Sequence, residues 1–494
     1  MSMPEEFDSV GQVPGLLLGY VSVRSQGGIS ALEAEPRALA SAEPFQASRD
    51  DHDEARGALE SAGLEVVGES RLGQAVAGPP EAFEELTGGK CVTREVLLHA
   101  EAGRERYVTH VDIVGSGQPD TLGLGMVASE AARIEGLLLE RPRILQAVFP
   151  APIPPTVPKF HLRVPDDVAL LLGATAAHRK GYEGAGVTVA MVDSGQYAHP
   201  FFLVHGYDVK AAVSVVPGAS PARDPVGHGT GESANIFSVA PAATLRPYRA
   251  SDVQGRLVGA ITGFLRAKTE VPRPQVLTNS WGGDGPYPPD GPLDPWDRVW
   301  ALEIRDAVEQ GIVVVFSAGN GSFTVEPQVP GVLAAGGVYA TAGLDLRASD
   351  YASGYDSPWF EGVTVPTVCG LVGMRPRAQY LMLPIPAGSE IDVGESVSAA
   401  GDSPDGTAGN DGWALFSGTS AAAPQLAGVV ALILGARPGL TPAQVRQALV
   451  ETAVDVRAGR CHPRFNFPAQ FGPDRATGSG LVSGAAAVAR ALIL

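Results

Sequence analysis

Short apolar runs alternate with helical patterns over the first hundred residues of the chain. Strand-like runs cover residues 20–23, 64–67, 74–77 and 91–98. Between them, a polar helical pattern lies at 51–62, and a second one with proline in its first turn lies at 79–86. Strand, helix, strand, repeated once, predicts a small α+β domain of ferredoxin-like type.

The chain between residue 100 and residue 164 predicts a domain boundary. Residues 107–114 alternate like a strand, and residues 128–139 have a helical pattern. Five prolines follow between residues 149 and 158, and they exclude a helix or a central strand there. We therefore expect an extended linker at 149–164. The linker separates an α+β region (19–148) from a larger domain (165–494), and a flexible N-terminus (1–18) precedes the α+β region.

Beyond residue 165 the apolar runs become longer and nearly continuous. Residues 184–195, 276–283 and 312–320 each run into small polar residues, and helical patterns at 257–268 and 296–310 separate them. Strands without polar alternation are buried on both faces, and strand–helix alternation gives right-handed crossovers. The predicted fold class is therefore α/β, a doubly wound, mostly parallel sheet with helices on both faces.

The most apolar stretch follows a cluster of small residues. Phe-Ser-Gly-Thr-Ser-Ala-Ala-Ala-Pro at 416–424 leads directly into the apolar residues 425–434. We expect a buried helix with Ser420 at its N-terminus, where Pro424 is tolerated because first-turn N–H groups have no helical partner. A hydroxyl there, at the positive end of a helix, suits a nucleophile. The alternative is that Gly-Thr-Ser only caps a helix.

Composition and charge narrow the class of protein. The 494 residues carry 36 basic and 54 acidic side chains, and the net charge of −18 argues against nucleic acid or an anionic membrane as a partner. The alternative is that an acidic surface only keeps the chain in solution. Three widely spaced cysteines form neither a disulfide framework nor a CxxC metal site.

No long apolar run and no N-terminal leader pattern is visible. A membrane span needs about 18 consecutive apolar residues, and the chain has no such run, so we expect no membrane insertion. The first ten residues lack the basic and apolar regions of a signal peptide. We therefore expect synthesis in the cytoplasm, with export, if any, by a leaderless route.

Candidate partners for the serine stand upstream. His228 lies between glycines at the start of a helical segment, which leaves room around its ring, whereas His199 and His205 lie in a loop. Asp193 ends a buried strand, where it can orient an imidazole. Asn320 follows another strand, and its amide can donate to an oxyanion. Each has an ordinary alternative, a cap for the aspartate and a turn for the asparagine.

Four motifs together carry a family resemblance. They are Asp193-Ser-Gly, Gly227-His-Gly-Thr, Ser317-Ala-Gly-Asn320 and Gly418-Thr-Ser-Ala-Ala-Ala-Pro424. In this order the chain resembles the subtilisin-like serine proteases (subtilases). The order Asp, His, Ser differs from that of chymotrypsin-like chains and of α/β-hydrolases, whose Gly-x-Ser-x-Gly elbow is absent around Ser420.

The resemblance implies roles for the candidate residues. Ser420 is expected as the nucleophile, His228 as the general base and later acid, and Asp193 as the carboxylate that orients the imidazole. Asn320 and the backbone N–H of Ser420 are expected to form the oxyanion hole. The chain is then a serine endopeptidase that works through an acyl-enzyme. A transpeptidase or peptide cyclase on the same fold and an inactive peptide-binding scaffold are the alternatives.

The resemblance also assigns a substrate cleft in which a peptide binds as an added strand. The residues implied are Ser280, Trp281, Gly282 and Gly283 beside the S1 pocket, Ser251 and Gly255 on the opposing segment, and Ser317, Ala318 and Gly319 before the oxyanion amide. The expected partner is a protein or peptide substrate, and a separate inhibitor protein is a further hypothesis. The segment after His228 lacks the Asn-rich loop of the calcium site of many subtilases, so no metal or cofactor is expected.

Two further regions acquire a meaning from the resemblance. Residues 19–100 have the pattern of an inhibitory prodomain, with a retained accessory domain as the alternative. The stretch 375–413 is longer than the family minimum and is either a lid beside Ser420 or an inserted surface loop. Its acidic residues, Asp402, Asp405 and Asp411, do not have the spacing of an EF-hand.

Overall fold

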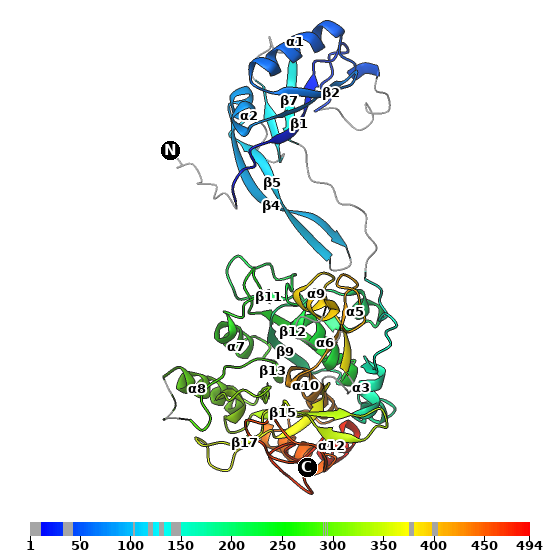
Figure 1. Ribbon diagram of the computed structural model, residues 1–494, viewed down its shortest axis with the longest axis vertical. Coiled ribbons are helices and arrows are strands. Elements are labelled where there is room, and N and C mark those ends of the chain that lie inside the picture. The colour runs from blue at the N-terminus through cyan, green and yellow to red at the C-terminus, as the bar shows by residue number, and fades with distance from the viewer. Residues whose placement is uncertain are drawn as a thin grey trace. The chain divides into compact units, whose positions relative to one another are not determined.

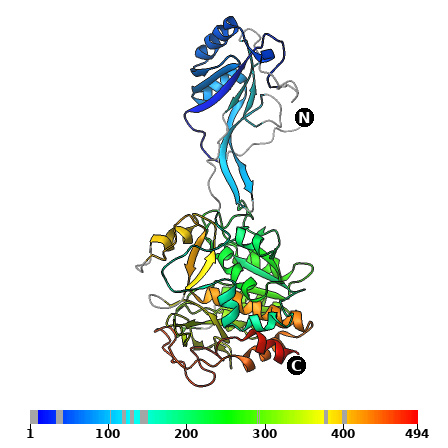
Figure 2. The same cartoon turned by 90° about the vertical axis from the view of Figure 1, so that its right-hand side faces the viewer.

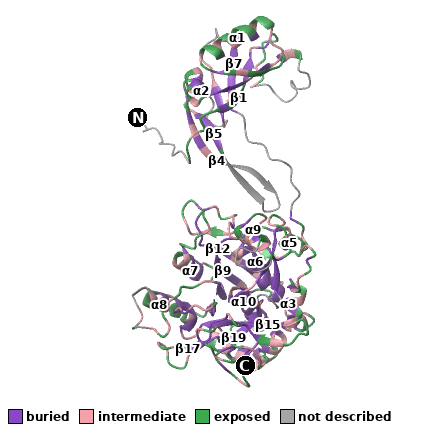
Figure 3. Cartoon of the chain, viewed as in Figure 1, coloured by how far each residue is buried: buried purple, intermediate pink, exposed green. Residues whose placement is uncertain are grey.

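The chain folds into two compact units, each with its own hydrophobic core. The computed structural model describes residues 11–32, 43–101, 104–116, 122–127, 133–139, 150–289, 291, 293, 295–374, 380–397 and 404–494. One unit comprises Met1–Glu101 and Glu105–Ala147, and the other is built on Val148–Leu494. Both can be followed in Figure 1 and, turned by 90°, in Figure 2. Buried residues gather inside each unit (Figure 3).

The N-terminal unit is an antiparallel sheet that packs against two helices. Its five-stranded sheet has the order β2-β3-β1-β7-β6, and every described pair in it is antiparallel. The fully buried side chains of Val21, Leu59, Phe83 and Leu137 form the centre of its core. The elements are β1 (Leu17–Val23), η2 (Glu43–Phe45), α1 (Arg49–Ser61), β2 (Glu65–Glu69), β3 (Gly73–Gly78), α2 (Pro80–Thr87), β4 (Lys90–Glu101), β5 (Arg104–Val114), β6 (Leu124–Met126) and β7 (Ile134–Leu139).

Two details of this unit differ from the sequence-based expectation. The helix predicted at 128–139 is wrong for residues 134–139, which form strand β7, while residues 128–132 lie outside the described residues. Gly136 weakens a helix there, and pairing with β1 decides the local structure. β1 begins at Leu17, so the chain is ordered two residues before the predicted end of the flexible N-terminus.

The predicted strand at 91–98 is present as part of β4, but it does not join the five-stranded sheet. β4 is hydrogen-bonded to β5 in a separate two-stranded sheet. The strand beside β1 on the side away from β3 is β7 instead. The sequence pattern alone cannot show this exchange, because the choice of strand beside β1 depends on pairing between distant segments.

The C-terminal unit is organised around a mostly parallel sheet. The order is β10-β12-β9-β13-β14-β15-β16, and only β16 runs antiparallel among these neighbours. The register pairs Asp193 of β9 with Arg249, and Val192 with Asn279, so the strands end at a common edge. The strands are β9 (Thr188–Asp193), β10 (Asp208–Val209), β11 (Val213–Ser214), β12 (Thr244–Arg249), β13 (Val276–Asn279), β14 (Val313–Ser317), β15 (Leu333–Ala340), β16 (Leu346–Ala348) and β19 (Val368–Leu371).

Helices cover both faces of this sheet. Val189 and Met191 of β9 belong to the core that includes α6 (His228–Val239) and α10 (Thr419–Ala436), whereas Ala190 and Val192 face the core that includes α7 (Ala260–Lys268) and α8 (Pro295–Glu309). Successive side chains of a strand point to opposite faces, so a strand between two helical layers must be apolar throughout. The predicted α/β fold with a mostly parallel sheet and helices on both faces is confirmed.

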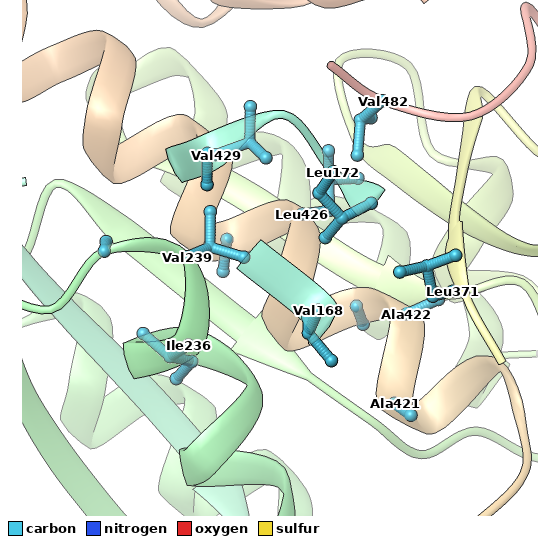
Figure 4. Close-up of a cluster of buried hydrophobic side chains, with 14 of the residues drawn as sticks. Val168, Leu172, Ile236, Val239, Leu371, Ala421, Ala422, Leu426, Val429 and Val482 are labelled. Atoms are coloured by element: carbon cyan, nitrogen blue, oxygen red, sulfur yellow. The ribbon is translucent and has the colours of Figure 1, made fainter. Parts of the chain in front are cut away.

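The long helix α10 lies in the centre of this unit. Its residues Ala421, Ala422, Leu426 and Val429 pack among side chains of α3 (Asp166–Leu171), α6 and β19 (Figure 4). A Cβ atom at Gly428 would lie 2.9 Å from the carbonyl oxygen of Ile236, so glycine lets α10 and α6 approach closely. Among the described residues, α10 is the helix with the length and hydropathy of a membrane span, and 83% of that window is buried in the protein. The core therefore accounts for its apolar character.

The remaining elements surround this centre. A smaller sheet has the order β21-β20-β8, so the last residues of the predicted linker form its edge strand. The predicted insertion contributes the buried strand β20 and helix α9, while residues 375–379 and 398–403 lie outside the described residues. These elements are β8 (His161–Arg163), α3 (Asp166–Leu171), α4 (Ala174–His178), α5 (Pro200–Val204), η4 (Glu326–Gln328), β17 (Tyr355–Asp356), β18 (Thr364–Val365), β20 (Tyr380–Pro384), α9 (Glu390–Val397), β21 (Trp413–Phe416), α11 (Pro442–Thr452) and α12 (Gly484–Ala491).

Candidate active site

A strand end and a helix start bring an aspartate and a histidine together. Asp193 is the last residue of β9, and His228 is the first residue of α6. The Nδ1 atom of His228 lies 2.7 Å from Oδ1 of Asp193. A Cβ atom at Gly229 would lie 2.2 Å from the carbonyl oxygen of Gly195, so only glycine lets α6 start this close to the end of β9.

A second carboxylate, Asp224, fixes the first turn of α6. Its oxygens accept hydrogen bonds from the backbone N–H groups of Gly227 and Thr230, at 3.0 and 2.8 Å, and from the hydroxyls of Thr230 and Ser194. Such an acceptor satisfies the free donors of a helix start. Because its bonds go to the helix start and to Ser194, Asp224 is a structural group here, and Asp193 is the carboxylate hydrogen-bonded to His228.

The environment of His228 favours its charged form. Burial alone lowers the pKa of the imidazole, but the charge of Asp193 and the hydrogen bond to it outweigh burial. Glu232 and Asp224 add to the same effect, and together these groups raise the pKa of His228 to about 10. These carboxylates thus favour the protonated form of the imidazole.

The serine lies at the N-terminus of α10 in reciprocal contact with the end of β13. The hydroxyl of Ser420 donates to the carbonyl oxygen of Ser280 at 3.1 Å, and the hydroxyl of Ser280 donates to the carbonyl oxygen of Ser420 at 2.8 Å. That carbonyl has no helical partner, because the residue four positions later is Pro424, which has no N–H. The two reciprocal hydrogen bonds therefore fix the positions of Ser420 and Ser280 relative to each other.

The hydroxyl of Ser420 is not hydrogen-bonded to His228 among the described residues. The donated bond to Ser280 occupies it instead. The position of Ser280 nevertheless links the two halves of the site, because it directly follows Asn279, which pairs with Val192 just before Asp193. A rotation about the Cα–Cβ bond of Ser420 redirects the hydroxyl, and such hydrogen bonds are often absent before substrate binds.

Asn320 is oriented by the start of α10. Its Oδ1 atom accepts hydrogen bonds from the backbone N–H and the hydroxyl of Thr419, at 2.9 and 3.0 Å. The amide Nδ2 atom therefore faces Gly418, where a Cβ atom would lie only 3.1 Å from it. Gly418 has a φ of +130°, which also favours glycine. The amide donor is thus left available beside the backbone of Ser420.

The expected cleft residues fall into two groups. Trp281 is anchored by a 2.8 Å bond from its Nε1 to the carbonyl oxygen of Val192, and Gly282 and Gly283 are exposed. Ser251 is fully buried, and its hydroxyl donates to the carbonyl oxygen of Ser194, so it supports the site from behind. The other expected cleft residues lie close by: Gly255 in a turn after Asp252, and Ser317, Ala318 and Gly319 between β14 and Asn320.

A cavity of about 640 Å³ adjoins the exposed glycines. Its lining includes residues 257–258, 260–261, 281–286 and 323–326, together with Trp300 and Trp359. Glu326 lines this cavity with 5% of its side chain exposed, and burial raises its pKa. The hydroxyl of Thr324 donates to it. No sequence pattern pointed to this acid, because Val-Glu-Pro is typical of an ordinary loop.

A second acid that sequence reasoning missed is Glu232. It follows His228 by one turn of α6, and its Oε1 lies 3.8 Å from the Nε2 atom of His228. A glutamate inside an otherwise small and apolar helix, four residues after the histidine, was the available signal. Within the described ranges, no group of three or more His, Cys, Asp or Glu side chains forms a potential metal site.

Comparisons with known proteins agree with the motifs. The family model described as the subtilase family matches residues 184–480. A probable subtilase-type serine protease of Deinococcus radiodurans is 30% identical over 348 residues, which are 63% of this chain and 41% of that protein. Subtilisin E of Bacillus subtilis is 31% identical over 294 residues, which are 57% of this chain and 64% of that protein. The chain thus spans less than two thirds of the length of these relatives.

Two solved structures are also similar. Fervidolysin from Fervidobacterium pennivorans has a TM-score of 0.47 at 18% identity, covering 96% of this chain and 61% of that one. A lanthipeptide protease has a TM-score of 0.47 at 20% identity, covering 65% and 92%. The family model matches well over half of the chain and includes all four motifs, so the resemblance seen in the sequence is confirmed. The chain belongs to the subtilase family.

Proposed function

We propose that this chain is a serine endopeptidase that uses Asp193, His228 and Ser420. The observation that carries the proposal is the 2.7 Å contact between Asp193 and Nδ1 of His228, at the same sheet edge as a serine on a helix N-terminus. With Nδ1–H donated to the carboxylate, Nε2 is the atom free to take a proton.

The reaction follows from these positions. Ser420 Oγ attacks the scissile carbonyl while its proton passes to Nε2 of His228, and Asp193 stabilises the imidazolium that forms. The carbonyl oxygen becomes an oxyanion, which the Nδ2 amide of Asn320 and the backbone N–H of Ser420 stabilise. His228 then protonates the leaving amine, and water hydrolyses the acyl-enzyme by the same steps in reverse order.

The first step requires the Ser420 hydroxyl to leave Ser280. One staggered rotation of χ1 breaks a single hydrogen bond at 3.1 Å, whereas the backbone stays held by the Ser280 hydroxyl. A neutral hydrogen bond contributes about 1 kcal/mol net, so this rotation is a small part of the barrier. A substrate that pairs with the segment 280–283 also competes for the carbonyl of Ser280.

The direct test is the Ser420→Ala variant. We expect hydrolysis of a peptide substrate to fall by about 10⁶-fold, the loss known for the corresponding change in subtilisin, with thermal unfolding nearly unchanged. A fluorophosphonate probe should label the wild-type serine and leave the variant unlabelled. Turnover retained by the variant, or label on another residue, would contradict the assignment.

We propose further that the cavity beside Gly282 and Gly283 prefers a basic side chain of the substrate. Glu326 lines it, and no lysine or arginine among the described residues pairs with this carboxylate. Asp284 also lines the cavity, but Arg464 neutralises it at 2.7 Å. An arriving lysine or arginine would thus supply the missing charge to Glu326.

Matched peptides that differ in one lysine or leucine near the scissile bond test this preference. We expect Glu326→Gln to lower kcat/KM for the lysine peptide about tenfold relative to the leucine peptide. The control Asp284→Asn, which removes a charge that is already paired, should change the ratio much less. An equal loss for both peptides would rule out a charge preference.

We also propose that the N-terminal unit is a prodomain of ferredoxin-like type. It has its own core, and four of its strands follow one another in the antiparallel order β2-β3-β1-β7. Mass spectrometry of the incubated full chain tests this role. The wild type should lose its first 140 to 160 residues or so, at the boundary between the units, while Ser420→Ala stays intact.

A further inference from the structure

Glu232 places a buried carboxylate beside the proton-accepting nitrogen of His228. Its side chain is 1% exposed, and its Oε1 lies 3.8 Å from Nε2 of the histidine. The neighbours along α6 from Gly229 to Val239 are all buried. In the part of the chain that the structure describes, no lysine or arginine is bonded to Glu232, so His228 is the cation that faces it. Burying an ionised acid without a permanent counter-charge costs folding free energy, which suggests that Glu232 has a function.

Hydrogen bonds hold this carboxylate in place. Its Oε2 accepts from Nδ2 of Asn235 at 2.9 Å, and Oδ1 of Asn235 accepts from Nε2 of Gln425 on α10 at 3.1 Å. Gln425 is bonded in turn to both backbone groups of Leu371 on β19. The network joins α6 to the helix that carries Ser420. A glutamine at 232 could accept the same bond from Asn235, so the network itself does not require a charge.

Two carboxylates therefore flank one imidazole, Asp193 at Nδ1 and Glu232 at Nε2. Asp224 contributes a weaker charge from the loop before α6, where donors from the helix start occupy it. The helix α10 carries no acidic, basic or histidine side chain. Two other elements that pack on α6 carry titratable side chains. In α3, Asp166 is exposed and Asp167 pairs with Arg163. In β20, the titratable residue is Tyr380.

We propose that Glu232 is a positioning residue that acts through His228: when ionised, it holds the imidazolium with its Nε2 proton directed at Glu232, and so withholds the base from Ser420. This proposal rests on the proposed endopeptidase function. In the resting site, the hydroxyl of Ser420 is bonded to Ser280 and not to the imidazole, as expected when Nε2 already carries a proton. Loss of that proton makes Nε2 an acceptor and lets the serine turn towards it.

The direction of the pH dependence follows. Burial, against the opposing charge of His228, raises the pKa of Glu232 to about 7, and the pKa of His228 lies at about 10. Above the pKa of Glu232, the carboxylates of Asp193 and Glu232 are both charged, and they stabilise the imidazolium of His228 most strongly. Each pH unit below the pKa of the base reduces its free fraction about tenfold, so activity rises as pH rises above neutral. Removing the charge at 232 lowers the pKa of His228.

The test is the pH profile of kcat/KM for the full chain and for E232Q. We expect the acid limb of E232Q to lie about 2 pH units lower than that of the wild type, with a similar plateau at high pH. At pH 7.5 the variant is then the faster enzyme by at least about tenfold. Glu232→Asp keeps the charge at a greater distance and should give an intermediate limb. Glu309→Gln, an exposed acid paired with Arg305, is the matched control and should leave the profile unchanged.

An acid limb of E232Q at the wild-type position would overturn the proposal, and so would loss of activity at every pH. Histidine labelled with ¹³C at Cε1 provides a second readout that does not depend on turnover. The signal of His228, assigned by its absence from a His228→Ala sample, should titrate at lower pH in folded E232Q than in the wild type. If neither protein cleaves peptides, the endopeptidase function fails while this titration still decides the role of Glu232.

Discussion

The two halves of the site are held in different ways. On one side, Asp193 and His228 are already paired at 2.7 Å, and backbone contacts between β9 and α6 fix their spacing. On the other side, Ser420 is bonded to Ser280, and its hydroxyl must turn before it can react. The Asp193–His228 pair is therefore preorganised by the fold, whereas the orientation of the Ser420 hydroxyl depends on one local hydrogen bond.

The largest loss of kcat is expected from a change in the Asp193–His228 pair. Asp193→Asn removes the acceptor for Nδ1–H and lets the amide donate to Nδ1, which places the proton on Nε2 and blocks the base. We expect kcat to fall about 10⁴-fold, as in the equivalent change in trypsin, with the fold intact by circular dichroism. Asp224→Asn is the control, because Asp224 caps α6, and it should lower stability more than kcat. Comparable kcat losses in the two variants would place the orienting role on both acids.

A smaller loss is expected from the oxyanion donor on the nucleophile side. Asn320→Ala should lower kcat by about 10²–10³-fold with little change in KM, since the amide binds charge that exists only in the transition state. Asn320 also accepts bonds from Thr419, so Thr419→Val, which removes one of them, controls for a loosened helix start. A loss in Thr419→Val as large as that in Asn320→Ala would assign the effect to positioning of α10.

The smallest effect is expected from the bond between the two serines. Ser280→Ala leaves the carbonyl of Ser420 without a donor, because Pro424 cannot supply one. We expect the free energy of unfolding to fall by about 1–2 kcal/mol and kcat to fall less than about tenfold. Ser214→Ala, which removes a similar bond to the carbonyl of Val216, is the control for stability alone. A kcat loss equal to that of Asn320→Ala would make Ser280 part of the reaction itself.

The fold of the C-terminal unit could be predicted because its strands have a distinctive composition. Runs such as 312–316 are apolar at every position, and the structure places them between two helical layers. The polar residue that ends such a run must then lie at the sheet edge, which is why the positions of Asp193 and Asn320 at that edge could be predicted from the sequence. Local composition and tertiary environment agree at these positions.

The parts that could not be predicted depend on contacts between distant segments. Residues 134–139 form a strand only because β1 is available to pair with them. The burial of Glu232 and Glu326 likewise depends on the tertiary fold, since glutamates are ordinarily exposed. The bond between Ser420 and Ser280 joins residues 140 positions apart. A sequence motif does not specify the side-chain rotamer of Ser420 that makes this bond.

The glycine at 229 shows how little of this chemistry depends on the reacting groups alone. Its α-hydrogen faces the main chain at Gly195, where even a methyl group would lie within 2.2 Å of an oxygen. The distance between acid and base is therefore set by two backbones in contact. An alanine at this position would force that contact apart, and the chain would keep every reactive side chain while losing the proton-transfer geometry. When a subtilase is judged active from its three catalytic residues alone, the residue that corresponds to Gly229 should be inspected as well.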